Sequence, residues 1–160
     1  MVRWAEPVEL PGLIGVEVAA DGLFQQVGIT FPPGTTMIEE ADDTSPVLVE
    51  GDPPAGFALM GLVDGNLHLE QLAVHPDRMR QGIGGRLIEA VLDHGRASGV
   101  PAVTLTTFRD VPWNAPWYER HGFQVWPEAS WGPELRELVK RERDLGIEVA
   151  PRVAMGATLG

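Results

Sequence analysis

A glycine-rich turn stands between a strand-like run and an amphipathic helix, and it narrows both the fold and the chemistry of the chain. The strand-like run covers residues 67–74, and Gly-Ile-Gly-Gly at residues 82–85 opens a helix predicted over residues 82–98. Glycine lets backbone N–H groups approach a ligand closely, and a helix N-terminus carries partial positive charge. The turn therefore predicts a phosphate or pyrophosphate site, unless glycine serves only a tight turn. Three arginines add positive charge beside it: Arg78, Arg80 and Arg86.

Three kinds of phosphate-bearing ligand fit such a turn, and the residues discriminate between them. A Walker loop ends in Gly-Lys-Ser or Gly-Lys-Thr, which this sequence lacks. A dinucleotide fingerprint needs a third glycine where Leu87 stands. It also needs an acidic residue at the end of the next strand, and residues 102–108 hold none. Coenzyme A is the third ligand.

The strand predicted over residues 67–74 changes its apolar face part-way along. Its leucines at 67 and 69 fall on odd positions, whereas the apolar residues at 72 and 74 fall on even positions. Strand side chains alternate with a period of two, so one extra residue between Glu70 and Leu72 would produce this change. The pattern predicts a β-bulge, although a strand end buried on both faces would also explain it.

The rest of the chain alternates between strand-like and helical patterns. Asp64-Gly65 predicts a tight hairpin turn, and residues 31–46 predict a loop with one short helical turn. Strands that alternate with helices indicate an α/β or α+β domain with a mixed sheet, in one unit spanning 1–160. Helices are expected at 8–27, 82–98, 114–120 and 133–145, and strands at 47–49, 56–63, 67–74, 103–108, 123–126 and 152–159.

Composition excludes several classes of protein. Cysteine is absent, which rules out disulfides, thiolate catalysis and cysteine zinc sites, and no metal is expected. No apolar run approaches the roughly 20 residues of a membrane-spanning helix, and the start lacks the apolar region of a signal peptide. A cytoplasmic protein without membrane association is therefore expected. The net charge of −11 offers no basic footprint for nucleic acid.

The negative charge is unevenly distributed along the chain. No lysine or arginine lies between Arg3 and Arg78, although acidic residues occur throughout that stretch. A solvated acidic face is one explanation. The other is a surface that attracts a cationic substrate.

Two segments together resemble the GNAT superfamily of acyl-CoA-dependent N-acyltransferases. Leu-Ala-Val-His-Pro at residues 72–76, followed by the glycine turn, is similar to the acetyl-CoA-binding segment of that superfamily. Asn114, then Tyr118 and the Gly122-Phe123 pair, are similar to its second signature. The segments occur in the expected order, and the layout from the first helix to the last strand fits nearly the whole chain.

The resemblance implies a mostly antiparallel, twisted sheet with one splayed strand pair, flanked by helices. The pantetheine arm of acetyl-CoA would lie in the V between the splayed strands, where the predicted bulge falls. It would pair with the backbone of Leu72, Ala73 and Val74, and Asn114 would bond the same arm. The residues implied for the pyrophosphate site are Arg80, Gln81, Gly82, Ile83, Gly84, Gly85 and Arg86.

One position departs from the family pattern. The family usually carries Arg or Gln three residues before the first glycine of the turn, where this chain has Met79. Arg78 and Arg80 flank that position and could substitute for it. Because such a donor site depends mainly on backbone groups, weakened but not abolished CoA binding is expected.

Amine acetylation needs a neutral amine, a donor for the thioester oxygen and a proton for the leaving thiolate. The resemblance implies that Tyr118, the single tyrosine, protonates the thiolate; otherwise it is a packing residue. Glu70 is the first choice for the base, directly or through water, and His68 on the same strand face is its rival. Either could instead be an ordinary half-exposed strand residue. Trp113 and Trp117 are candidates for the acceptor wall, against the commoner role in core packing.

The sequence thus predicts an acetyl-CoA-dependent N-acetyltransferase that acts on the primary amine of a small, cationic acceptor. Transfer would be direct, in a ternary complex, because a cysteinyl acyl-enzyme is excluded. The alternative is a non-catalytic acyl-CoA-binding sensor or regulatory module, for which Met79 is the main support. A third alternative is a nucleotide-binding enzyme, against which the missing third glycine and the missing acidic residue argue. The sequence leaves open which amine is the acceptor and whether the acyl donor is longer than acetyl. It also leaves open whether the chain forms a homodimer, which is common in such families.

Overall fold

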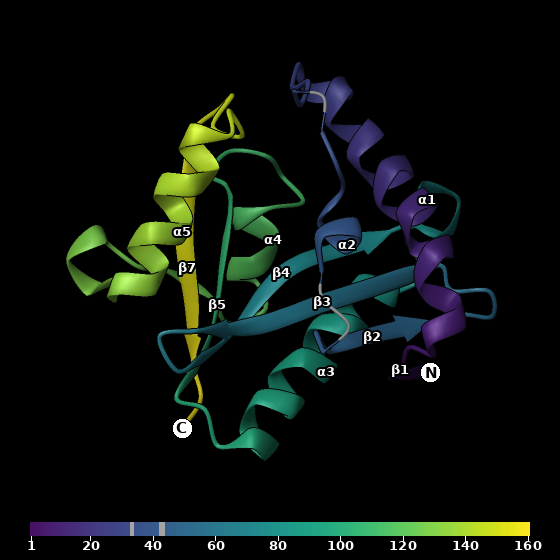
Figure 1. The fold of residues 1–160 in the computed structure, drawn as a ribbon, viewed down its shortest axis with the longest axis horizontal. Helices are drawn as coiled ribbons and strands as arrows, with labels where there is room; N and C mark the ends of the chain where they lie inside the picture. The colour runs from purple at the N-terminus through teal and green to yellow at the C-terminus, as the bar shows by residue number, and fades with distance from the viewer. Residues whose placement is uncertain (33, 42–43) are drawn as a thin grey trace.

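A computed structural model gives the fold of residues 1–32, 34–41 and 44–160 (Figure 1). Within these residues, seven strands form one sheet in the order β1-β2-β3-β4-β5-β7-β6. All neighbouring pairs are antiparallel except β4 and β5, which are parallel. The predicted mixed, mostly antiparallel sheet is confirmed. The strands are β1 (Val2–Trp4), β2 (Val47–Glu50), β3 (Gly56–Val63), β4 (Asn66–Val74), β5 (Ala102–Phe108), β6 (Gln124–Val125) and β7 (Arg152–Thr158).

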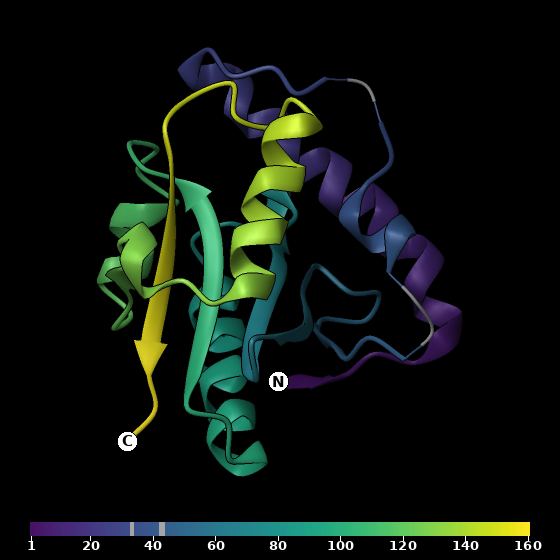
Figure 2. The same ribbon diagram turned by 60° about the vertical axis from the view of Figure 1, so that its left-hand side comes forward.

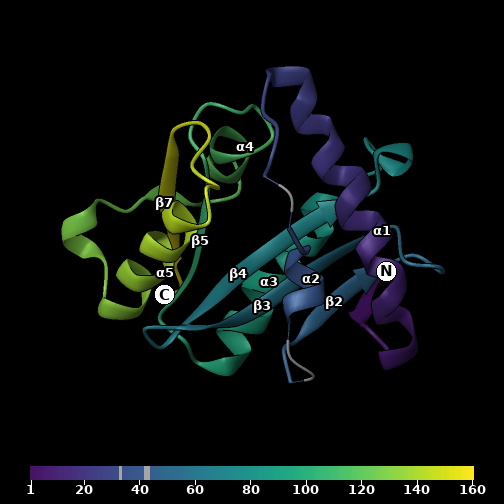
Figure 3. The ribbon, with the colours of Figure 1, turned by 45° about the horizontal axis from the view of Figure 1, so that its top comes forward.

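In the part of the chain that the structure describes, five α-helices cover the two faces of the sheet. We call the face under α3 and α4 the α3 face, and the face under α1, α2 and α5 the α1 face. Figure 2 shows α4 and α5 on opposite sides of β5 and β7, and Figure 3 shows α1 and α2 over β3 and β4. The helices are α1 (Leu10–Asp21), α2 (Met37–Glu40), α3 (Ile83–Ser98), α4 (Ala115–Glu119) and α5 (Pro133–Asp144).

Two expectations near the N-terminus differ from the structure. The helix expected over 8–27 is α-helical only in α1, with short 3₁₀ helices at Pro7–Glu9 and Gly22–Val27 on either side. Strand β1 was not predicted, because three residues are too few to show an alternating pattern. The short helical turn expected within 31–46 is α2, while residues 33, 42 and 43 of that segment lie outside the described residues.

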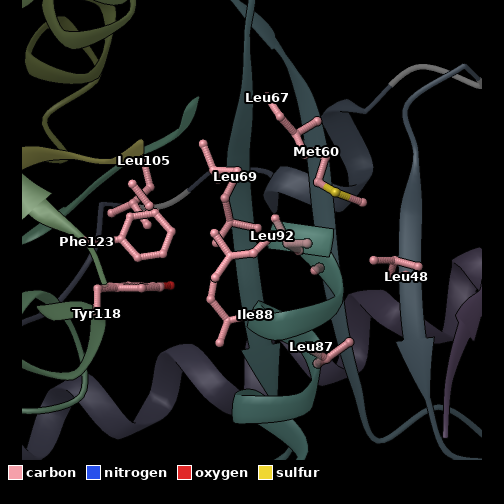
Figure 4. Close-up of a cluster of buried hydrophobic side chains, with 14 of the residues drawn as sticks. Leu48, Met60, Leu67, Leu69, Leu87, Ile88, Leu92, Leu105, Tyr118 and Phe123 are labelled. Atoms are coloured by element: carbon pink, nitrogen blue, oxygen red, sulfur yellow. The ribbon is translucent and has the colours of Figure 1, made fainter. Parts of the chain in front are cut away.

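The core on the α3 face holds α3 and α4 against the sheet. Figure 4 shows Leu87, Ile88 and Leu92 of α3 packed between Leu48 of β2 and Leu69 of β4. These three side chains of α3 are at most 4% exposed, because they fall at helical spacing on one side of an amphipathic helix. This packing fixes the glycine turn relative to β4. No helix in the described ranges is long and apolar enough to cross a bilayer.

Strand β4 carries the predicted bulge. Leu59 pairs with Gln71 and Met60 pairs with Leu69, so Glu70 is the additional residue on β4. Leu69 before the bulge and Leu72 after it both pack in the core of the α3 face. The bulge therefore explains the change of apolar phase in the sequence.

Strands β4 and β5 separate soon after they meet. They pair only at Leu67 with Val103 and at His68 with Thr104. Beyond this point β4 stays paired with β3, and β5 stays paired with β7. The sheet thus opens into a V between β4 and β5 (Figure 1), as the resemblance implies.

The hairpin turn between β3 and β4 caps α5. The Asp64 carboxylate accepts hydrogen bonds from the backbone N–H groups of Glu134 at 2.9 Å and Leu135 at 3.0 Å. The Glu134 carboxylate in turn accepts one from the Asp64 N–H at 2.6 Å. This reciprocal cap satisfies N–H groups that have no partner inside the helix, and it fixes the N-terminus of α5 on the α1 face.

Candidate active site

The glycine turn presents the N-terminal end of α3 to solvent. Arg80 and Gly82 both adopt left-handed backbone conformations, with φ of 64° and 77°. Within α3, the N–H of Arg86 bonds to the carbonyl oxygen of Gly82 at 3.0 Å. The N–H groups of the preceding residues lack a partner inside the helix, because a helix leaves its first N–H groups unsatisfied. Residues 83–85 therefore offer a cluster of donors suited to an anion.

The three predicted arginines are not equivalent. Arg86 donates from Nε to Glu50 Oε1 at 2.7 Å and from Nη2 to Glu50 Oε2, which forms a bidentate ion pair with β2. These bonds hold the pKa of the Glu50 carboxyl below its ordinary value. Arg78 donates to the side chain of Gln81 at 3.0 Å, and Arg80 is exposed. The charge of Arg86 is thus balanced by Glu50, which leaves Arg78 and Arg80 as the available cations of the turn.

The end of β4 offers backbone groups to the V. The N–H of His75 bonds to the carbonyl of Ala55 on the β3 side at 2.7 Å. Because N–H groups alternate between the two edges of a strand, those of Leu72 and Val74 face the opposite edge, toward the V. The Leu72 N–H donates to the side-chain oxygen of its neighbour Gln71 at 3.1 Å. An extended ligand could pair with this edge as an added strand.

Tyr118 lies in α4 on the α3 face. Its ring packs on Trp117 and Phe123, with ring centroids 5.1 Å and 5.6 Å away. Figure 4 shows the hydroxyl pointing from α4 toward the side chains of α3 and β4. Burial raises the pKa of this hydroxyl above its ordinary value of 10.0, so it keeps its proton at neutral pH. Within the described ranges the hydroxyl has no hydrogen-bond partner.

Asn114 joins α4 to the end of β5. Its Oδ1 accepts hydrogen bonds from Thr107 Oγ1 at 2.7 Å and from the Phe108 N–H at 3.3 Å. These bonds set the position of α4, and therefore of Tyr118, relative to β5. The side-chain NH₂ of Asn114 is left as a donor, which is the group that the predicted bond to pantetheine would use.

The two candidate bases lie together on the α1 face of β4. His68 pairs with Gly61, and a Cβ placed on Gly61 would lie 2.6 Å from Glu70 Oε1, so the Glu70 carboxylate rests against this glycine. The expectation that both share one face is confirmed. His68 is 2% exposed and its Nδ1 bonds to Thr104 Oγ1 at 2.8 Å. Burial lowers the pKa of His68 to about 4, so the ring is neutral at neutral pH.

The structure separates the two tryptophans that were candidates for either the acceptor wall or core packing. Trp113 lies on the α1 face in a cluster centred on Phe24. The ring centroids of Phe31, Phe108 and Trp113 lie 5.2 to 5.6 Å from that of Phe24. Trp117 lies beside the glycine turn, 3.5 Å from a Cβ placed on Gly84. The aromatic cluster joins the segment after α1 to the end of β5. Sequence reasoning missed it, because its members come from distant segments.

Two acidic residues of α1 were also missed. Glu17 is 2% exposed, and its carboxylate accepts hydrogen bonds from the N–H groups of Met37 at 2.7 Å and Ile38 at 3.0 Å. It caps α2, and burial raises its pKa. Asp21 lies one turn later, where burial, with a smaller effect of Glu17, raises its pKa to about 7. The signal in the sequence was a pair of acids four residues apart among apolar neighbours.

A groove beside the turn and the lack of a metal-binding group among the described residues characterise the surroundings of the site. An open groove of about 450 Å³ runs along α3 from the turn, lined by Gly82, Gly85, Arg86, Glu89 and His121 among others. The part of the chain that the structure describes contains no group of three or more His, Asp or Glu residues placed to hold a metal ion.

Residues 21–123 match the acetyltransferase (GNAT) family. Similar solved structures include the ribosomal-protein-S18-alanine N-acetyltransferase of Escherichia coli, with 20% identity, coverage of 100% of this chain and 94% of that one, and a TM-score of 0.68. A GNAT-family acetyltransferase of Staphylococcus aureus is 12% identical, with coverage of 100% of this chain and 99% of that one, and a TM-score of 0.72. The PaiA N-acetyltransferase of Thermoplasma acidophilum, in complex with coenzyme A, is 16% identical, with coverage of 99% of this chain and 98% of that one, and a TM-score of 0.65. At these identities the likeness concerns the fold.

Proposed function

Because the chain belongs to the acetyltransferase (GNAT) family, we propose that it transfers an acetyl group from acetyl-CoA to the primary amine of a small, cationic acceptor. Transfer is direct, within a ternary complex. The observation that carries the proposal is the parting of β4 and β5 after His68 and Thr104, beside a helix N-terminus that offers free N–H groups. An unpaired strand edge and an anion site suit the pantetheine and pyrophosphate of one ligand.

The donor enters from the α3 face. Pantetheine pairs with the backbone of Leu72, Ala73 and Val74, and the NH₂ of Asn114 adds a hydrogen bond. The pyrophosphate binds the N–H groups of the turn, with Arg80 as the nearest available cation, and the groove along α3 leaves room for the nucleotide end. Arg86 acts here through its ion pair with Glu50, which holds the first turn of α3 in place.

The reaction joins groups from both faces of the sheet at the V. The amine nitrogen attacks the thioester carbon; the C–N bond forms and the C–S bond breaks. Glu70, directly or through one water, accepts the proton that the amine loses, and Tyr118 gives its proton to the leaving sulfur. The N–H of Leu72 stabilises the oxygen as it becomes negative, in place of its present bond to Gln71.

Glu70 is favoured over His68 as the base by the surroundings of the two side chains. His68 is buried and bonded through Nδ1 to Thr104, whereas Glu70 is only partly buried. A histidine whose pKa lies near 4 takes up a proton poorly at neutral pH. The carboxylate is therefore the group that we assign to proton removal.

The cationic nature of the acceptor is supported by charge on the α1 face. The acceptor enters from this face, where the carboxylate of Glu70 lies against Gly61. The absence of lysine and arginine between Arg3 and Arg78 adds to the negative potential of this half of the chain.

The competing function is an acyl-CoA sensor without turnover, favoured by Met79 at a position that usually carries Arg or Gln. Calorimetric titration with acetyl-CoA, with NAD and ATP as controls, tests the donor. Selective binding is expected. Failure to bind acetyl-CoA would contradict both functions, whereas binding without transfer to polyamines, aminoglycosides, amino acids or peptide amines would favour the sensor.

A further inference from the structure

The parting of β4 and β5 coincides with a side-chain hydrogen bond between the two strands. His68 and Thr104 form the last residue pair before the strands diverge, and His68 Nδ1 lies 2.8 Å from Thr104 Oγ1. Both side chains lie on the α1 face of the sheet. The bond therefore joins the two strands at the apex of the V, where the backbone ladder ends.

Both partners are shielded from water. His68 is 2% exposed and Thr104 is 1% exposed. A buried polar group that loses its partner is left without water to replace it, so the bond stabilises this arrangement over one in which the strands meet elsewhere. Val103 and Leu105, beside Thr104 on β5, face the opposite core and offer β4 no polar contact.

We propose that the hydrogen bond between His68 and Thr104 is a clamp that fixes the apex of the V, and that His68 and Thr104 are positioning residues for acetyl-CoA. The clamp sets where β4 becomes free of β5, and hence which backbone groups of residues 72–74 stand open to pantetheine. It acts through the strand and touches neither the amine nor the thioester. The proposal rests on the proposed function for its ligand.

The clamp differs from a catalytic role of His68 in what it needs from the side chain. A base needs a nitrogen that takes up a proton, whereas the clamp needs a hydrogen-bonding atom at the position of Nδ1. Asparagine places such an atom there without a titratable ring. Serine keeps the hydroxyl of Thr104, and valine keeps its shape without the hydroxyl. These three substitutions separate the two roles.

The test compares Thr104→Val, Thr104→Ser and His68→Asn by steady-state kinetics with acetyl-CoA and by the pH profile of kcat. Thr104→Val is expected to raise KM for acetyl-CoA about tenfold, with a smaller change in kcat. Thr104→Ser and His68→Asn are expected to stay within about threefold of the unmodified chain, with the same pH profile. An unchanged KM in Thr104→Val overturns the clamp. A large loss of kcat with an altered profile in His68→Asn overturns it in favour of a base.

A second measurement does not depend on turnover. Hydrogen exchange of the free protein is expected to quicken at residues 67–69 and 103–105 in Thr104→Val but not in Thr104→Ser. Thr158→Val, at an exposed position of β7, is the matched control. Unchanged exchange in Thr104→Val contradicts the clamp even if the chain proves inactive. A chain that shows the exchange effect yet binds no acetyl-CoA contradicts the proposed function alone.

Discussion

Arg86 at the start of α3 and Glu50 on β2 form a bidentate ion pair, and the Glu50 side chain is only 9% exposed. The pair ties the glycine turn to the sheet strand beneath it. Three features of the site thus have structural anchors. The turn is held by Glu50, the apex of the V by the bond between His68 and Thr104, and α4 by Asn114 on β5.

Removing Arg86 leaves the Glu50 carboxylate buried without its main partner. Arg86→Ala is expected to lower the free energy of unfolding only modestly at pH 7, because Arg86 is half exposed and water screens the pair. The folded pKa of Glu50 is depressed, so the contribution of the pair is complete above the ordinary value of 4.5 and is lost as the pH falls through the folded pKa. Urea unfolding at pH 7 and pH 4 measures this. An equal loss at both pH values would contradict the assignment.

The cap on α5 gives a second prediction. Asp64→Ala is expected to lower the free energy of unfolding by about 1–2 kcal/mol, because two N–H groups of α5 lose their acceptor. Asp64→Asn is the control, since asparagine caps helices and tolerates the left-handed conformation of this residue. Chemical denaturation of both variants checks the effect. Equal losses for alanine and asparagine would point to the charge of Asp64 instead of its role as a cap.

Tyr118→Phe tests the proton donor. The substitution is expected to lower kcat by about 10²-fold or more while KM for acetyl-CoA changes little, because only the proton for the sulfur is lost. Thermal unfolding should be nearly unchanged, since the described residues give the hydroxyl no hydrogen-bond partner. Unchanged turnover would remove Tyr118 from the mechanism.

Glu70→Gln tests the base with a side chain of nearly the same shape. It is expected to lower kcat/KM for the amine by about 10²–10⁴-fold with acetyl-CoA binding kept. His68→Asn, measured beside it, should retain activity. The reverse ranking of these two variants would transfer the role of base to His68.

Asp21 gives a prediction with the opposite dependence on pH. Its folded pKa, about 7, lies above its ordinary value of 3.8, so the folded protein binds a proton that the unfolded chain releases. Asp21 therefore lowers stability progressively as the pH rises from 3.8 to about 7. Asp21→Asn is expected to raise the free energy of unfolding by about 1–2 kcal/mol at pH 8 and to have little effect near pH 4. A stabilisation that does not vary between these pH values would show that Asp21 titrates normally.

The parts of the site that were predicted come from local patterns. The shift of apolar positions between residues 69 and 72 marks the bulge, because each strand residue reports its own face. The glycines at 82, 84 and 85 mark the turn, because positive φ and close backbone approach are properties of single residues. The splayed pair and the roles of Tyr118 and Asn114 came from the family resemblance.

The parts that were missed depend on contacts between distant segments. Glu50 and Arg86 lie 36 positions apart in sequence, and no local pattern indicates that Glu50 is the partner of Arg86. The pairing of His68 with Thr104 likewise requires knowing which strand follows β4 in the sheet. The ring cluster around Phe24 forms only once the segment after α1 reaches the end of β5. Sequence patterns report local conformation, so these long-range contacts needed the fold.

The most direct test of the proposed function follows both products of one reaction. The chain is incubated with acetyl-CoA and, in separate reactions, with polyamines, aminoglycosides, amino acids and peptide amines. Free CoA is measured by thiol titration, and acetylated amine by mass spectrometry. The account predicts that both appear in equal amounts, with cationic acceptors preferred and with both lost in Glu70→Gln. Saturable binding of acetyl-CoA, with neither product formed from any amine, would contradict it.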